Sequence, residues 1–346
     1  MKALNLYGVE DIRCEETVMP TIVNPDDILI EVKATGICGS DSSRYKKLGP
    51  YIKGMTFGHE FSGVVAAVGA DVSTVNKGDA VVGCPAIVCY ECEYCERGEY
   101  ARCNNLFVTG SYRPGSFAQY ICLPESNVLP MDEAIGFEQG AMIEPSAVVA
   151  HGFYQSQIKP GDTVAIIGCG SIGLLAVQWA KIFGAAQIIA IDIDDNKLTL
   201  AQQFGADILI NSHTQSLAQQ KEQLFPSGVD LAVESAGAPQ TINDALMLPQ
   251  KGGEVILIGI PYADMVIERQ YFEKILRNEL NVIGSWNGIS SPFPGKEWKA
   301  TLHYMATGDL NVKPMITTRV ALDEGPEIFD KLVNHKEKYN KIMFIP

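Results

Sequence analysis

Four cysteines whose spacing suits metal binding lie within fifteen residues of one another: Cys89, Cys92, Cys95 and Cys103. Two, two and seven residues separate them, and the intervening segments are polar and acidic. Four thiols at this spacing predict a closed tetrahedral Zn²⁺ site. Because a closed site leaves no position for a reactant, we expect a structural zinc that holds a surface lobe of about residues 86–106.

Disulfides and an iron–sulfur cluster are the alternatives for these cysteines. The first residues of the chain have no charged segment followed by an apolar one, so we expect a cytoplasmic protein, where disulfides are rare. In the bacterial ferredoxin pattern the fourth cysteine follows after three residues and precedes proline. Here Cys103 follows after seven residues and precedes Asn104. The spacing therefore favours zinc.

A second, reactive zinc would need about three protein ligands and one open position. Cys38 and His59 are the strongest candidates, although each could also be an ordinary buried side chain. Glu144 lies among apolar residues, where a carboxylate is costly unless it is paired or binds a metal. We therefore predict a catalytic zinc on Cys38, His59 and Glu144. Glu60 is expected either to orient a ligand or to act as an alternate ligand that exchanges with water.

A glycine-rich motif follows the apolar run 163–167 and precedes a helical segment, which is the context that dinucleotide binding requires. Its glycines permit a tight turn and let backbone amides approach a pyrophosphate, whose charge the helix N-terminus favours. The predicted cofactor-binding residues of the motif are Gly168, Gly170, Ser171, Ile172 and Gly173.

The second strand of this unit is predicted to end at Asp192, where a carboxylate can accept hydrogen bonds from the adenosine ribose hydroxyls. The same charge would repel a 2′-phosphate, so NAD is preferred over NADP. A role as helix cap fits Asp194 or Asp195 better than Asp192. Lys197 is a weaker candidate for a cofactor contact, because a lysine here is most often a solvated helix residue.

The elements that must position these residues change character along the chain. Up to about residue 145, short apolar runs are separated by Gly, Pro and Asp, as in β-rich domains. From residue 159, strand-like runs alternate with helical ones, which indicates a parallel α/β sheet, and after residue 284 the pattern is irregular again. We expect strands at 27–32, 62–69, 163–167, 187–191, 208–210, 231–233, 255–260 and 342–345, and helices at 172–183, 196–204 and 298–305, with the last strand returning to the first domain.

Composition limits the possible functions. A chain of 346 residues with 47% hydrophobic residues is expected to form two domains. Its net charge of −14 argues against nucleic acid as a partner, because phosphate backbones are bound by lysine and arginine. No stretch approaches the roughly 20 apolar residues that span a bilayer, so no membrane partner is expected.

Taken together, these motifs resemble the zinc-dependent medium-chain dehydrogenase/reductase family, in its sorbitol dehydrogenase branch, over essentially the whole length. Three further segments resemble the subgroup that acts on polyol phosphates such as galactitol 1-phosphate. The family motifs are Cys38-Gly39-Ser40-Asp41, Gly58-His59-Glu60, the four-cysteine lobe, Glu144-Pro145 and the glycine motif; the subgroup segments are Ile275 to Leu280, Gly284-Ser285-Trp286 and Ser290 to Trp298.

The resemblance implies an α/β fold with a GroES-like, β-rich catalytic domain of residues 1–147 and 284–346, interrupted by a doubly wound Rossmann NAD-binding domain of residues 148–283. It implies two zinc ions per chain and a homodimer or homotetramer. The implied reaction is NAD-dependent, zinc-assisted hydride transfer from a secondary alcohol of a polyol phosphate. Ser40 would pass the hydroxyl proton outward. Where some relatives continue the relay with histidine this chain has Ser43, so water or Glu60 must complete the route.

Substrate residues are predicted from charge and position. Arg44 follows the Cys38 loop closely, and Arg44 and Arg113 suit bidentate contact with a phosphate. Trp286 is expected to form a wall of the pocket, although aromatic residues in such loops more often simply pack. Sorbitol, xylitol, arabitol or arabitol phosphate are alternative substrates. A catalytically idle NAD-binding protein is the alternative from another class.

Overall fold

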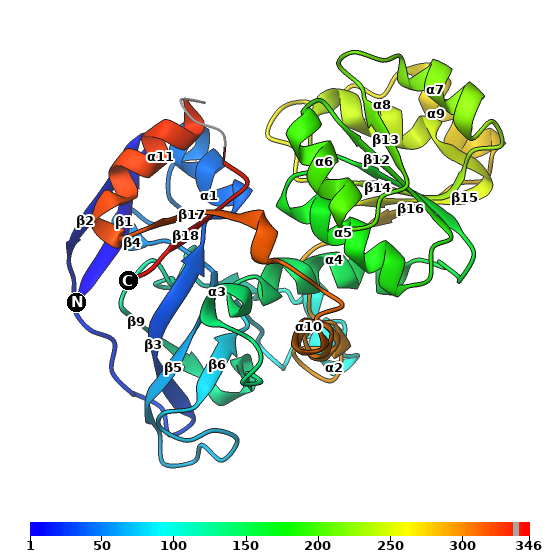
Figure 1. The fold of residues 1–346 in the computed structure, drawn as a ribbon. Coiled ribbons are helices and arrows are strands. Elements are labelled where there is room, and N and C mark those ends of the chain that lie inside the picture. The colour runs from blue at the N-terminus through cyan, green and yellow to red at the C-terminus, as the bar shows by residue number, and fades with distance from the viewer. Residues whose placement is uncertain (335–338) are drawn as a thin grey trace. The chain divides into compact units, whose positions relative to one another are not determined.

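The computed structural model describes residues 1–334 and 339–346, which form two compact units (Figure 1). The first unit contains Met1–Ala147, Gly288–Gly308 and Val312–Pro346, and the second contains Val148–Asn287 and Asp309–Asn311. Within the described residues, none of the helices combines the length and the apolar character needed to cross a bilayer.

The second unit is built on a six-stranded parallel sheet with the order β13-β12-β11-β14-β15-β16. The first three strands in sequence lie side by side, and the order then reverses across β11, which is the arrangement of doubly wound dinucleotide-binding sheets. The strands are β11 (Thr163–Ile167), β12 (Gln187–Asp192), β13 (Ile208–Asn211), β14 (Val229–Glu234), β15 (Pro249–Leu257) and β16 (Asn281–Gly284).

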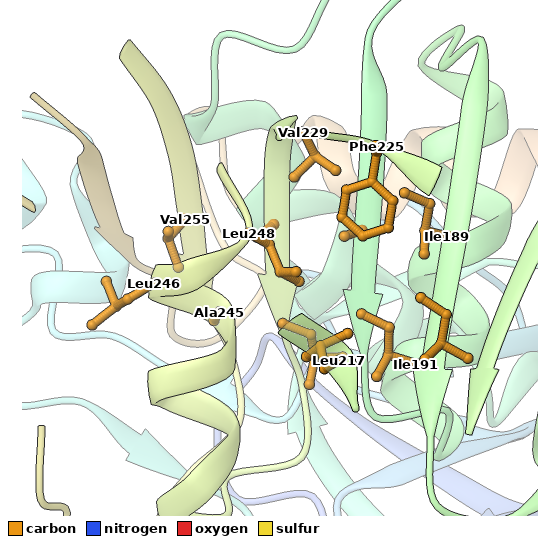
Figure 2. Close-up of a cluster of buried hydrophobic side chains, with 13 residues drawn as sticks. Ile189, Ile191, Leu217, Phe225, Val229, Ala245, Leu246, Leu248 and Val255 are labelled. Carbon is orange, nitrogen blue, oxygen red and sulfur yellow. The ribbon is translucent and has the colours of Figure 1, made fainter. Parts of the chain in front are cut away.

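Helices cover both faces of this sheet, so side chains on both faces are buried. Ala165 and Ile167 point into one hydrophobic cluster together with Ile189 and Ile191, whereas Val164 and Ile166 are equally buried on the opposite face. Figure 2 shows this cluster, to which α7 and α8 contribute Leu217, Ala245 and Leu246. The helices are α5 (Ser171–Ile182), α6 (Asp195–Gln203), α7 (Leu217–Leu224), α8 (Pro239–Met247) and α9 (Arg269–Arg277).

The first unit is β-rich and centres on the long strand β3 (Asp27–Gly36). β3 pairs antiparallel with three other strands of a seven-stranded sheet, β5, β9 and β18. The remaining strands of this sheet are β6, β10 and β17, and a smaller sheet has the order β2-β1-β4. The strands are β1 (Lys2–Gly8), β2 (Asp11–Glu16), β4 (Met55–Thr56), β5 (Glu60–Val68), β6 (Ala80–Gly83), β7 (Ala86–Ile87), β8 (Phe107–Val108), β9 (Tyr120–Pro124), β10 (Val128–Pro130), β17 (Ile316–Val320) and β18 (Lys341–Phe344).

The helices of this unit are mostly short. One of them, α4, begins in the first unit and ends in the second. The helices are α1 (Gly39–Ser43), η1 (Arg44–Leu48), α2 (Glu93–Glu96), η2 (Tyr100–Arg102), η3 (Glu125–Asn127), α3 (Phe137–Gly140), α4 (Ile143–Gln155), α10 (Lys296–Thr307), η4 (Lys313–Met315), η5 (Leu322–Glu324) and α11 (Gly325–Val333).

All eleven elements predicted in sequence are present, with small differences at their ends. The largest difference is in the strand expected at 255–260, since β15 spans Pro249–Leu257. The chain returns to the first unit at Gly288, four residues after the predicted boundary, because Ser285 still donates its backbone N–H to Leu257 beside β15. The excursion Asp309–Asn311 was not predicted; Asn311 donates its backbone N–H to Gln178 on α5 at 2.7 Å.

Candidate functional site

The register of two strands brings the predicted reactive residues of the first unit together. Gly36, the last residue of β3, pairs with Glu60, the first residue of β5. The Cys38 loop therefore leaves the sheet beside His59. As a result, the ligand atoms of Cys38, His59 and Glu60 all lie within 4.8 Å of one another. A thiol, an imidazole and a carboxylate at this separation are a suitable donor set for Zn²⁺.

Glu144 lies in the first turn of α4 and does not belong to this three-residue set. It is nevertheless near enough to interact electrostatically with His59 and Glu60. The Glu60 carboxylate, predicted as an orienting group or alternate ligand, therefore lies beside Cys38 and His59, with Glu144 as a second acid nearby. Which carboxylate binds the metal stays a prediction.

Asp41 orients the loop that carries Cys38. Its carboxylate accepts a hydrogen bond from the backbone N–H of Cys38 at 3.0 Å, and its second oxygen lies 3.7 Å from Nδ1 of His59. A buried carboxylate beside an imidazole is the usual device that fixes the orientation of a metal-binding histidine. Asp41 belongs to the motif that begins at Cys38, but this role was not predicted from the sequence.

Burial and neighbouring charges shift the pKa values of the ionisable groups in this cluster. Burial alone lowers the pKa of His59, but Asp41 and Cys38 outweigh it and raise that pKa well above its ordinary value. Burial raises the pKa of Asp41, and it raises the pKa of Glu144 to about 7. A divalent cation among these groups would favour their ionised forms.

Lys341 is a further member of the cluster that sequence reasoning missed. It begins β18, and its ammonium forms an ion pair with Glu60 and donates a hydrogen bond to the carbonyl oxygen of Ile37 at 2.9 Å. The available signal was a lysine next to the apolar run Ile342–Phe344 of a predicted strand. Its partner could not be inferred, because Glu60 lies 281 residues away in sequence.

His59 is held by a glycine turn that cannot accept a larger residue. Gly58 has a φ of +95°, and a Cβ there would lie 2.7 Å from the backbone nitrogen of Phe117. The carbonyl of Gly58 also accepts a hydrogen bond from Ser116 N–H at 2.9 Å. The segment before His59 is therefore fixed by these backbone contacts and by the buried side chain of Phe57.

The four cysteines of the lobe converge as predicted. Their sulfurs all lie within 4.8 Å of one another, with 3.9 Å between Cys89 and Cys95 and 3.5 Å between Cys89 and Cys103. A tetrahedral zinc with bonds of about 2.3 Å places its sulfurs about 3.8 Å apart, whereas a disulfide needs about 2.05 Å. The geometry of the lobe thus fits a zinc site made of four cysteines.

Hydrogen bonds within the lobe favour thiolates at its exposed side. Backbone N–H groups of Asn104 and Cys95 lower the pKa of the Cys92 thiol to about 6, whereas burial raises the pKa of Cys95 to about 12. Since only a thiolate binds zinc, such donors preorganise the site.

The glycine motif of the second unit joins β11 to α5. A different physical requirement explains each of its three glycines. Gly168 has a φ of +87°, which a tight turn requires. A Cβ on Gly173 would overlap the carbonyl oxygen of Gly168, so close packing of helix and strand excludes a side chain there. A Cβ on Gly170 would meet nothing within 4 Å, so protein packing alone does not demand glycine at that position. Close approach by a bound pyrophosphate would demand it.

Asp192 ends β12 and is tied to the glycine loop. Its carboxylate accepts backbone N–H groups from Cys169 at 2.6 Å, Ile193 at 2.7 Å and Asp194 at 2.9 Å. A carboxylate has about four acceptor positions, so about one is left for a ligand. Two ribose hydroxyls would need two. Asp194 caps α6 by accepting the N–H of Asn196, as predicted for Asp194 or Asp195 rather than Asp192.

Of the predicted substrate residues, Arg44 and Arg113 both lie in the first unit. The Arg44 guanidinium lies 3.3 Å from the centre of the Tyr51 ring and donates to the carbonyl of Gly49. Tyr51 in turn lies 4.9 Å from Tyr112, the neighbour of exposed Arg113, so the two arginines lie on adjoining segments.

Other residues near the site have simpler explanations. Trp286 belongs to the second unit and is half exposed, whereas Phe293 packs edge-on against Tyr90 and Tyr100 of the lobe. Lys46 forms an ion pair with Glu10, as expected for an ordinary surface charge. Ser40 lies half-buried on α1, two residues after Cys38.

Two family models match the chain. The alcohol dehydrogenase GroES-like domain matches residues 24–133, and the zinc-binding dehydrogenase model matches residues 171–306. These matches confirm the predicted fold class, a GroES-like domain together with a Rossmann-like one.

Individual relatives match over nearly their full length. Galactitol 1-phosphate 5-dehydrogenase of Escherichia coli (strain K12) is 37% identical over 336 residues, which cover 97% of each chain. Sorbitol dehydrogenase of Bacillus subtilis (strain 168) is 33% identical over 352 aligned positions, which cover 100% of this chain and 97% of the relative. The crystal structure of galactitol-1-phosphate dehydrogenase from Escherichia coli has a TM-score of 0.95 at 36% identity and covers 100% of both chains.

Proposed function

The chain belongs to the zinc-binding dehydrogenase family and is an oxidoreductase, and from this premise we propose that it oxidises a secondary alcohol of a polyol phosphate, such as galactitol 1-phosphate, with NAD as the hydride acceptor. The observation that carries the proposal is the convergence of Cys38, His59 and Glu60, three metal-binding side chains of different chemistry. The similarity to dehydrogenases named for galactitol 1-phosphate and sorbitol supports the substrate class.

Two zinc ions per chain are part of the proposal. Cys89, Cys92, Cys95 and Cys103 would hold the structural ion, and Cys38, His59 and Glu144 the catalytic one, with Glu60 as the alternate ligand. When bound, the catalytic ion supplies Lewis-acid polarisation of the substrate hydroxyl. Asp41 keeps Cys38 and His59 in orientation, and Ser40 accepts the hydroxyl proton and passes it on to water or Glu60.

The preference for NAD rests on Asp192, with Gly168, Gly170, Ser171, Ile172 and Gly173 cradling the pyrophosphate and Lys197 as a further contact. The carboxylate of Asp192 is fixed by three backbone N–H groups, so it cannot turn away from a 2′-phosphate. In this assignment the first unit is the catalytic domain and the second unit is the NAD-binding domain. By family resemblance the protein is a homodimer or homotetramer.

The test combines metal analysis with a substrate panel. We expect two zinc ions per chain and reduction of NAD with galactitol 1-phosphate. Cys38→Ser should lose one zinc and nearly all turnover, whereas the matched variant Cys122→Ser, on β9, should keep both. One zinc per wild-type chain, or undiminished turnover of Cys38→Ser, would contradict the proposal. No NADH formation with any polyol, despite two bound zinc ions, would favour an idle NAD-binding protein.

Sorbitol, xylitol, arabitol and arabitol phosphate in the same panel address the second candidate, a different polyol substrate. The Arg44 guanidinium keeps donors free for a phosphate, because the Gly49 carbonyl uses only part of its five N–H groups. Arg44→Ala should therefore raise KM for galactitol 1-phosphate. Lys46→Ala should not, because it loses only the surface contacts of Lys46 with Glu10 and Asn334. Equal kcat/KM for phosphorylated and free polyols would favour the second candidate.

A further inference from the structure

We propose that Lys341 is a positioning residue of the metal-binding cluster: its ammonium holds the Glu60 carboxylate back from the metal position and so keeps one coordination position open for the substrate. The inference rests on the proposed function, because it supposes that Cys38 and His59 hold a metal ion. Lys341 itself touches neither substrate nor metal in this role.

The contacts of Lys341 join the two segments that carry the cluster. Its Nζ forms an ion pair with Oε2 of Glu60, and it donates a hydrogen bond to the carbonyl oxygen of Ile37 at 2.9 Å. Ile37 directly precedes Cys38, and Glu60 directly follows His59. The side chains of Lys341 and Glu60 are each only 2% exposed. A buried ammonium between these two segments fixes their separation.

The backbone around this pair leaves room for it. Gly36 pairs with Glu60 on β5 and with Met343 on β18, so it lies between the two charged residues. A Cβ on Gly36 would lie 2.7 Å from Cε of Lys341 and would also collide with Oε2 of Glu60. A residue with a side chain at position 36 would therefore push the ammonium and the carboxylate out of their present contact.

The ammonium also competes with a metal for Glu60. The Glu60 carboxylate is within 4.8 Å of the ligand atoms of Cys38 and His59, which is close enough for it to reach a shared ion. Zinc in such sites takes about four ligands, so a carboxylate that binds permanently removes the position a substrate needs. Lys341 also faces Asp41 and Glu144 electrostatically, so without it three acids would surround the metal with one imidazole.

The experiment replaces zinc by Co²⁺, whose visible absorption reports the ligand set. Lys341→Met should change the Co²⁺ spectrum, tighten Co²⁺ binding and lower kcat by about 10- to 100-fold, because Glu60 is released to bind the metal. Adding Glu60→Gln to Lys341→Met should restore the wild-type spectrum, since a neutral amide is a poor ligand. Lys341→Arg keeps the charge and should resemble the wild type.

Two comparisons keep the test decisive. Lys2→Met removes an exposed lysine–carboxylate pair, with Asp323 at 2.6 Å, and should change neither spectrum nor kcat. Glu60→Gln alone should keep the wild-type spectrum; a changed spectrum would mean that Glu60 is already a ligand, which overturns the inference even if Lys341→Met does not fold.

The outcome also separates this inference from the proposed function. A Lys341→Met protein with an unchanged Co²⁺ spectrum and affinity but a lower Tm would show a merely structural ion pair and would overturn the inference alone. If the wild-type protein binds only one Co²⁺ per chain, the proposed function itself fails. Two bound ions together with a spectral change that Glu60→Gln reverses would support both.

Discussion

At the scale of single residues, the first unit places several carboxylates where water can stabilise them only weakly. Asp41 and Glu60 are almost fully buried, and Glu144 lies among apolar neighbours at the start of α4. Each has an opposite charge or a backbone donor to offset the cost of burial, with Lys341 and the Cys38 N–H as the closest. Removing one partner should therefore lower stability, because it leaves a buried charge unpaired.

Glu144 makes the stability of the metal-free protein depend on pH. Burial, partly opposed by His59 and Lys341, raises its pKa from 4.5 to about 7. An acid that holds its proton more tightly in the folded state stabilises that state fully below the unfolded pKa. The benefit is lost as pH rises through the folded pKa, and the free energy of unfolding falls by about 3 kcal/mol over this window.

Glu144→Gln should remove this slope. In chelator-treated protein we expect the variant to gain stability relative to wild type between about pH 5 and about pH 8, by roughly the same 3 kcal/mol. Urea unfolding at the two pH values measures the difference. Glu133→Gln, at an exposed position, is the matched control. A difference between wild type and Glu144→Gln that does not depend on pH would contradict the prediction.

Asp192 should set the choice between the two nicotinamide cofactors. Asp192→Asn removes the charge and leaves one acceptor oxygen, which can serve either Cys169 of the glycine loop or Ile193 and Asp194, but not both sides. Loss of one charge-assisted hydrogen bond, worth about 1.5–3 kcal/mol, should lower kcat/KM for NAD by about ten- to a hundredfold and improve use of NADP. Steady-state kinetics with both cofactors checks this. The helix-cap variant Asp194→Asn should keep the wild-type preference, since asparagine caps equally well.

At the scale of elements, the cysteine lobe contains too little regular secondary structure to be stable by itself. Its helices α2 and η2 have four and three residues, and its strands β7 and β8 have two each. Such short elements bury little apolar surface to offset the entropy of ordering, so we expect the proposed zinc ion to supply the difference. The aromatic contacts of Tyr90 and Tyr100 with Phe293 then pack the lobe against the returning chain.

Chelation should therefore open the lobe before the rest of the molecule. Trypsin should cut after Arg97 and Arg102 in chelator-treated protein, because the turns that bond Gly98 to Cys95 and Cys103 to Tyr100 are no longer fixed. Mass spectrometry of the first fragments identifies the cuts. Cys92→Ser should show the same pattern without chelator. If zinc-loaded and chelated proteins are cut here at equal rates, the lobe does not depend on a metal.

At the scale of the whole molecule, the two units differ in how the chain builds them. The six-stranded sheet of the second unit comes from one continuous stretch, 163–284, whereas the first unit needs β17 and β18 from the end of the chain beside β3. Long-range pairing of this kind leaves the N-terminal part with an unpaired strand edge and half of a core until the C-terminus arrives.

Fragments should behave accordingly. Residues 148–287 alone should unfold cooperatively and be stabilised by NAD, with some loss because Gln178 no longer meets Asn311. Residues 1–147 should not fold, since Phe329 and Phe344, which pack on Phe117, are missing. Thermal unfolding followed by circular dichroism, with and without NAD, measures both. A cooperative transition in fragment 1–147 would contradict this expectation.

Features that depend on neighbouring residues could be predicted from the sequence alone. The strand, glycine turn and helix from Thr163 to Ile182 follow from local pattern, and so do the capping by Asp194 and the convergence of the four cysteines, whose close spacing limits where their thiols can go. Such features are set by backbone geometry and short-range hydrogen bonds, which adjacent residue types dictate.

Only the tertiary structure shows which residues from distant parts of the sequence meet in the metal-binding cluster. The register of β3 against β5 places Glu60 beside Cys38 and His59, and β18 delivers Lys341 to the same point. Neither follows from spacing along the chain, because a shift of one residue in strand register would turn these side chains to the opposite face of the sheet. The packing of whole strands against one another, and the energetic need to pair a buried charge, selected this arrangement.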